Sequence, residues 1–181
     1  MLDEQVRNII DTYYNGENAD LYIRKSSEKI ELPVNVVSFC ESNNVEVKCM
    51  TDYENPSDQW YFTMGQYKED GFKIEYTSIL TISKLANIYG LDHRFKVLNR
   101  DPEKIAPVLI GDAEETFSFT QFDFEEIIKQ CFEEIGYTRM FWRDSERRIE
   151  GVNFAEGVTI FGPDVTQGDI LFRDVLEILP D

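Results

Sequence analysis

The clearest element of the chain is a helix over 120–136, where the sequence reads TQFDFEEIIKQCFEEIG. Its apolar residues recur at intervals of three and four, which is the spacing of one helix face. They are Phe124, Ile127, Ile128, Cys131, Phe132 and Ile135. Thr120 or Asp123 is placed to cap the start of this helix, and Gly136 to end it. We therefore expect a core helix over 124–135.

Strand signals surround this helix on both sides. Residues 45–50 alternate apolar and polar side chains, and 60–67 and 72–77 flank the turn Glu69-Asp70-Gly71, which predicts a hairpin. Shorter strands are expected at 94–98, 117–119 and 158–161, and further hairpins at 21–32 and 138–150. The second of these hairpins would carry the basic residues Arg139, Arg143, Arg147 and Arg148.

Helical spacing recurs in four other places. Residues 2–13 form an amphipathic stripe, and a short helix is expected over 34–39 behind Pro33. A third stripe runs over 79–89, with Gly90 placed to end it, and Thr166 is a cap for a last helix. Helices and strands thus interleave irregularly. This pattern favours an α+β fold with a mainly antiparallel sheet and three to four amphipathic helices.

The length of 181 residues suits a single domain over 1–181. The stretch 99–115 has two Pro, one Gly and a polar start, which is typical of a linker. Two lobes, 1–98 and 116–181, joined by 99–115, are therefore the alternative arrangement. The apolar runs are too short for a membrane span.

Charge is the strongest signal in the composition. Asp and Glu total 35 against 18 Lys and Arg, so the formal net charge is −17. Such a field repels phosphate backbones and anionic membrane surfaces, which bind through cations. It favours a basic protein partner, because opposite charges speed association. We therefore expect no direct binding to nucleic acid or to membranes.

The residue types that hold metals or act as nucleophiles are scarce. The three cysteines, Cys40, Cys49 and Cys131, form no Cys-x-x-Cys pair. The single histidine, His93, is expected at the surface or at the start of a strand, beside Asp92 and Arg94. A disulfide scaffold and a multi-histidine zinc site are therefore not expected. No phosphate-binding or nucleophile motif occurs. The expectation is a protein without cofactor, metal or catalytic residues. Unpaired thiols and the lack of a signal-like start favour the cytoplasm.

One enzymatic pattern remains as an alternative. Glu46-Val47-Lys48 places a carboxylate and an amine on one face of a strand, as metal-dependent nucleases of the restriction type do. Asp20 is the upstream carboxylate that would complete the set. Alternating polar residues on a half-buried strand explain the same pattern without catalysis.

Two acidic loops are the candidate partner-binding sites. The first combines carboxylates with aromatic residues that interfaces favour, and consists of Asp52, Tyr53, Glu54, Asp58 and Trp60. The alternative for Trp60 is that it faces the core from the strand that follows. The second loop carries Asp112, Glu114 and Glu115.

This profile resembles the immunity proteins of bacterial toxin systems, including contact-dependent growth inhibition. The resemblance lies in size, acidity and lack of catalytic motifs along the whole chain. It implies an antitoxin that binds and neutralises a basic toxin, commonly a nuclease, in the cytoplasm. The second hypothesis is a phage-type nucleic-acid mimic or regulator. The third is the metal-dependent nuclease that uses Glu46 and Lys48.

Overall fold

A six-stranded sheet forms the centre of the computed structural model, which describes residues 2–14, 18–51, 55–69, 72–99, 108–149, 165–176 and 179. The strands are β1 (Glu46–Thr51), β2 (Ser57–Glu69), β3 (Phe72–Ser83), β4 (Ile88–Asn99), β5 (Val108–Ala113) and β6 (Thr138–Arg139). β1 to β5 pair in sequence order, each antiparallel to the next, and β6 pairs with β4 in parallel. The predicted α+β fold with a mainly antiparallel sheet is confirmed.

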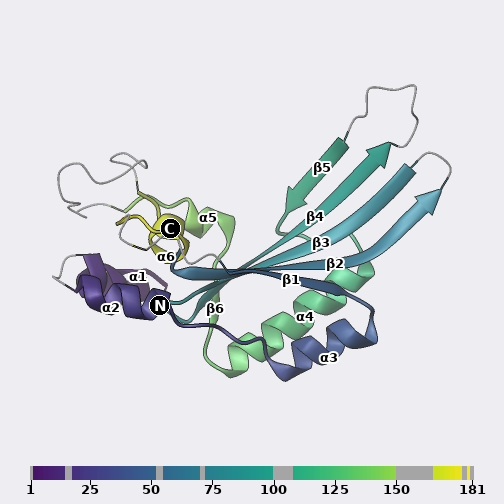
Figure 1. Cartoon of the computed structure of the whole chain (residues 1–181). Helices are drawn as coiled ribbons and strands as arrows, with labels where there is room; N and C mark the ends of the chain where they lie inside the picture. Colours follow the sequence, from purple (N-terminus) through teal and green to yellow (C-terminus); the bar gives the residue numbers. More distant parts are fainter. Residues whose placement is uncertain are drawn as a thin grey trace.

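The helices cover the sheet unequally. They are α1 (Leu2–Ile9), the π-helix η1 (Ile10–Tyr14), α2 (Ala19–Ser26), α3 (Val34–Ser42), α4 (Phe119–Glu134), α5 (Trp142–Ser145) and α6 (Gln167–Phe172). Figure 1 shows α3 and α4 lying against one side of the sheet. The other helices gather at one end, with α5 and α6 on the opposite side from α4 (Figure 1). Among the described helices, none therefore covers the whole of that second face of the sheet.

The first core lies between the sheet and α4. Phe62 of β2 packs against Phe124 with ring centroids 4.5 Å apart, and Tyr89 of β4 packs against Phe132 at 5.0 Å. The predicted stripe of α4 supplies the buried side chains Phe124, Ile128, Cys131 and Phe132. Burying this stripe holds the helix on the sheet, because tertiary packing supplies most helical stability in proteins.

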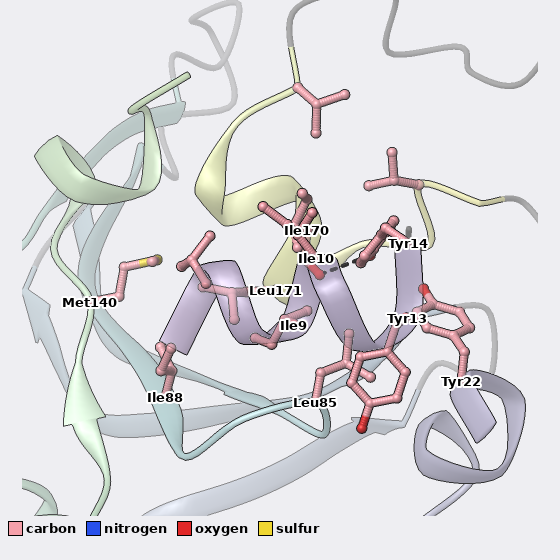
Figure 2. Close-up of a cluster of buried hydrophobic side chains, with 13 residues drawn as sticks. Ile9, Ile10, Tyr13, Tyr14, Tyr22, Leu85, Ile88, Met140, Ile170 and Leu171 are labelled. Carbon is pink, nitrogen blue, oxygen red and sulfur yellow. Dashed lines mark hydrogen bonds between the residues drawn. The ribbon is translucent and has the colours of Figure 1, made fainter. Parts of the chain in front are cut away.

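The second core joins the two ends of the chain. Ile9, Ile10, Tyr13 and Tyr14 pack against Ile170 and Leu171 of α6 and against Leu85 and Ile88 (Figure 2). The Tyr14 hydroxyl donates a hydrogen bond to the carbonyl of Ile170 at 3.0 Å, and the Tyr22 hydroxyl donates to Asp174 at 3.0 Å. Residues more than 150 positions apart are thus held together, and this places α6 beside the sheet.

The predicted helix over 79–89 is wrong. β3 continues to Ser83, and β4 begins at Ile88. Leu80 and Ile82 face α4, while Ile79 is also buried from the other side. A strand buried on both faces has apolar residues at odd and even positions, so its pattern also matches a helix. The β-branched residues of 77–82 favour the strand.

Four other local predictions are wrong in whole or in part. Residues 21–32 contain α2 rather than a hairpin, and 117–119 lead into α4, whose cap is Ser118. Residues 138–150 contain β6 and α5 rather than a hairpin. Within the expected linker 99–115, Val108–Ala113 form β5 and pair with β4. The strand expected at 158–161 lies outside the described residues.

Most strongly patterned elements are confirmed. The stripe over 2–13 forms α1 and η1, the strand over 45–50 is β1, and the strands expected over 60–67 and 72–77 lie in β2 and β3, which pair antiparallel. Gly136, at φ +83°, follows the end of α4, as the left-handed position there favours glycine. Thr166 caps α6 through a capping box with Asp169.

Candidate protein-binding cleft

A cleft of about 1020 Å³ lies between the sheet and helices α5 and α6. Its floor is a row of paired residues that crosses four strands: Met50, Gln59, Thr81 and Gly90. The row next to it, Cys49, Trp60, Leu80 and Leu91, turns to the α4 side, because neighbouring strand residues point to opposite faces. The cleft therefore lies on the face of the sheet that α3 and α4 leave open.

Helices α5 and α6 form the wall of the cleft. They approach closely at Gly168, where an added Cβ would lie 3.1 Å from the Cβ of Ser145 and 3.2 Å from its carbonyl oxygen. Trp142, the first residue of α5, lines the cleft with 41% of its surface exposed. An alanine at position 168 would require Ser145 to shift by a few tenths of an ångström.

Trp142 is fixed by two acidic residues. Its indole Nε1 donates a hydrogen bond to Asp92 Oδ1 at 2.5 Å, and its backbone N–H donates to Glu114 Oε1 at 2.5 Å. Asp92 comes from β4, and Glu114 from the segment between β5 and α4. Asp92 and Trp142 line the cleft, and we call them, together with the adjoining Glu114, the acidic corner of the cleft.

The corner has an excess of negative charge. Burial raises the pKa of Asp92 above the ordinary aspartate value, and the nearby carboxylates of Glu114 and Asp112 act in the same direction. The hydrogen bond from Trp142 and the charge of Arg139 oppose this rise in pKa. Farther along the cleft, Asp169 is paired with Arg173 at 3.2 Å. Among the described acidic residues that line the cleft, Asp92 and Glu146 thus have no ion-pair partner.

The second predicted loop adjoins the cleft. Glu114 belongs to the acidic corner, and Glu115 is exposed beside it. Asp112 is exposed near the end of β5 and pairs with Arg94 at 2.6 Å. The structure therefore brings Glu114 to Asp92 and Trp142, two residues that the sequence analysis did not select. Only the pairing of β4 with β5 and β6 brings these segments together.

Of the first predicted loop, the structure describes only Asp58 and Trp60, and both belong to β2. Asp52, Tyr53 and Glu54 lie outside the described residues, while Met50 and Asn55 on either side of them line the cleft. Trp60 is half-buried and packs against the core under α4, as the alternative for this residue required.

The expectation that Asp58 lies on an exposed loop is wrong. β2 begins at Ser57, and Asp58 is completely buried 3.1 Å from the ammonium of Lys84. Asp58 Oδ2 also accepts a hydrogen bond from the backbone N–H of Ile30 at 3.0 Å. A partner cannot reach this carboxylate, and its charge serves to hold the segment before α3 against the sheet.

Glu46 and Lys48 lie on the same face of β1, and both are exposed. Asp20, the third residue of the nuclease hypothesis, is exposed on α2. Among the residues that the structure describes, no three His, Cys, Asp or Glu side chains are grouped so that they could hold a metal ion.

His93 is buried beneath α4, not at the surface as expected. Its Nδ1 lies 2.9 Å from the hydroxyl of Ser78, and its Nε2 lies 3.3 Å from Glu125 Oε2, without hydrogen-bond geometry. Arg139 pairs with Glu125 and donates to the carbonyl of Leu91 at 2.9 Å. Ser78 and His93 are completely buried, so no substrate reaches this hydroxyl. The contacts of Glu125 with His93 and Arg139 hold α4 against the sheet.

Acid should weaken the fold through His93. Burial lowers the pKa of His93 below 6.5, and the carboxylate of Glu125 only partly opposes this. The unfolded chain therefore binds the proton at higher pH than the folded chain, and stability falls as the pH drops below about 6.5. Urea unfolding of wild type and His93→Gln at pH 7.5, 6.5 and 5.5 measures this. The variant should lose less stability between pH 7.5 and 5.5, and equal losses would contradict the assignment.

No protein-family model, curated protein or solved structure matches this chain. No helix in the described ranges is long and apolar enough to cross a membrane. The fold and the cleft define the class of protein: it is an acidic α+β protein with a concave, partly aromatic surface on an open sheet face.

Proposed function

We propose that this chain is a non-catalytic binding protein whose partner is a basic protein. In the narrower form of the proposal it is an immunity protein that binds and neutralises a basic toxin of the nuclease class in the cytoplasm. The net charge of −17 supports a basic partner, because an acidic field speeds its association and repels acidic proteins.

The observation that carries the proposal is the acidic corner of the cleft. A half-exposed tryptophan held between two carboxylates combines the features of an interface centre, where Trp and Tyr side chains supply most of the binding energy. The exposed carboxylates of Asp112 and Glu115 next to the corner would form an acidic rim. Rim charges affect chiefly the rate of association.

A co-purification experiment with charge-matched variants tests the proposal. Asp92→Asn with Glu114→Gln removes two charges from the corner and keeps both hydrogen-bond acceptors. The matched control, Glu126→Gln with Glu133→Gln, removes two charges from the exposed side of α4. From the native strain, wild type and control should co-purify with the same basic protein, and the corner variant should lose it.

Salt dependence gives the second measurement. Association with the recovered partner should slow as salt rises, because the Debye length shrinks from about 10 Å at 0.1 M to about 3 Å at 1 M. An acidic partner, or an association rate insensitive to salt, would contradict the electrostatic argument. A partner that is a host DNA-binding protein would favour the nucleic-acid mimic over the immunity protein.

We also expect the purified protein not to cleave DNA or RNA in the presence of Mg²⁺ or Mn²⁺. The physical reason is the acidic field, which disfavours the approach of a phosphate backbone. Gel assays of wild type, Glu46→Gln and Lys48→Ala check this expectation. Cleavage by wild type that either substitution abolishes would establish the nuclease instead.

A further inference from the structure

The indole of Trp142 is held in one orientation before any partner arrives. Its ring N–H is bound to Asp92 of β4, and its backbone N–H is bound to Glu114. Because both donors of this residue are used, the part of the ring that lines the cleft offers an aromatic surface rather than a hydrogen-bond donor. A fixed aromatic surface loses little conformational entropy on binding.

The two carboxylates of the corner have no ion-pair partner in the described part of the chain, although the charge of Arg139 acts on Asp92 from nearby. Within that part, no Lys or Arg forms an ion pair with Asp92 or Glu114. Two neighbouring cations have other ion-pair partners: Arg94 pairs with Asp112, and Arg139 pairs with Glu125. Arg139 also donates to the backbone carbonyl of Glu114 at 3.3 Å and leaves the Glu114 carboxylate itself without an ion pair. A half-buried carboxylate without a cation gains from one that a ligand brings.

We propose that the acidic corner receives an arginine side chain of the partner, with the guanidinium against the Trp142 indole and its N–H groups directed at Asp92 and Glu114. This inference rests on the proposed function and specifies which chemical group the cleft recognises. A planar guanidinium stacks on an aromatic ring and donates two parallel hydrogen bonds to a carboxylate. The ammonium of lysine is a more strongly hydrated point charge and satisfies this geometry less well.

Nuclear magnetic resonance with a tetra-arginine peptide tests the inference directly. The chain has two tryptophans, so its spectrum has two indole N–H signals, and the Nε1 of Trp60 is buried away from the cleft. At low salt, the Trp142 signal should shift and saturate on titration, while the Trp60 signal should stay in place. Tetra-lysine should bind several-fold more weakly, and tetra-glutamate should not bind.

Charge-matched variants show which carboxylates take part. Asp92→Asn with Glu114→Gln should weaken tetra-arginine binding about tenfold or more, because charge-assisted hydrogen bonds are lost. The α4 control, Glu126→Gln with Glu133→Gln, should bind nearly as wild type, and Trp142→Leu should bind more weakly. Chemical shifts elsewhere in the spectrum report whether each variant is folded.

Two results would overturn the inference. The first is a Trp142 signal that does not respond to tetra-arginine, even if signals elsewhere shift. The second is equal binding of tetra-arginine by the corner variant and the α4 control. The proposed function would still be tested separately by the co-purification experiment. A basic partner recovered there would then bind another surface of the protein. Equal affinity for tetra-lysine would overturn the preference for arginine.

Discussion

Phe132→Ala is expected to lower the free energy of unfolding by about 3–5 kcal/mol, the range for a fully buried phenylalanine. Phe132 lies on the inner face of α4, with its ring centroid 5.0 Å from that of Tyr89 and 5.2 Å from that of Tyr137. Removing the ring leaves a cavity that these rigid neighbours cannot fill. Ile128→Ala, one turn earlier and also completely buried, should cost about 2–5 kcal/mol.

The same helix supplies the control. Phe119 is the first residue of α4 and is 91% exposed, so Phe119→Ala makes the same chemical change where almost no surface is buried. Its effect should stay within about 0.5 kcal/mol, as for other surface substitutions. Urea unfolding followed by circular dichroism measures all three variants. Similar midpoints for Phe132→Ala and Phe119→Ala would show that α4 does not pack as described.

Lys84→Met is expected to destabilise the protein by about 3–5 kcal/mol, because it leaves the carboxylate of Asp58 buried without its cation. Both side chains are almost completely buried, with the ammonium 3.1 Å from Asp58 Oδ1. The ammonium also donates to the carbonyl of Ser26 at 2.8 Å, which links the end of α2 to the β3–β4 turn. The substitution therefore removes two interactions that hold the N-terminal segment.

An exposed ion pair provides the matched comparison. Lys25 contacts Glu28 at 2.8 Å with both side chains largely exposed, so Lys25→Met should cost less than about 1 kcal/mol. Adding Asp58→Asn to Lys84→Met should recover part of the loss, because the unpaired charge is then removed. Equal stability of Lys84→Met and Lys25→Met, measured by urea unfolding, would contradict the buried pair.

Local sequence patterns were sufficient to predict an element where only one of its faces packs against the core. The stripe of α4 and the alternation of β1 each repeat with a single period, and both are confirmed, as is the pairing of β2 with β3. The capping box at Thr166 is a contact over three residues, so it was also predictable from the sequence. These elements, together with the counts of residue types, were enough to predict the α+β class.

Local patterns failed where an element is buried on both sides. Between 79 and 89 the chain lies between α4 and the second core, so apolar residues occur at both odd and even positions and imitate a helix. His93 and Asp58 were misjudged for a related reason. Polar side chains are expected at the surface unless they have a buried partner. His93 lies beside Glu125, 32 positions away, and Asp58 pairs with Lys84, 26 positions away, so no local pattern indicates either contact.

By itself, the sequence determined the charge of −17, the periodic elements and the fold class, because these depend on composition and on neighbours within a few residues. Only the tertiary structure decided where the charge acts. It buried Asp58 with Lys84, placed Asp112 beside Arg94, and brought Asp92 and Glu114 to Trp142 at the edge of an open sheet face. Each of these contacts joins segments 18 to 50 residues apart, and pairing over such distances is set by strand register and packing rather than by local preference.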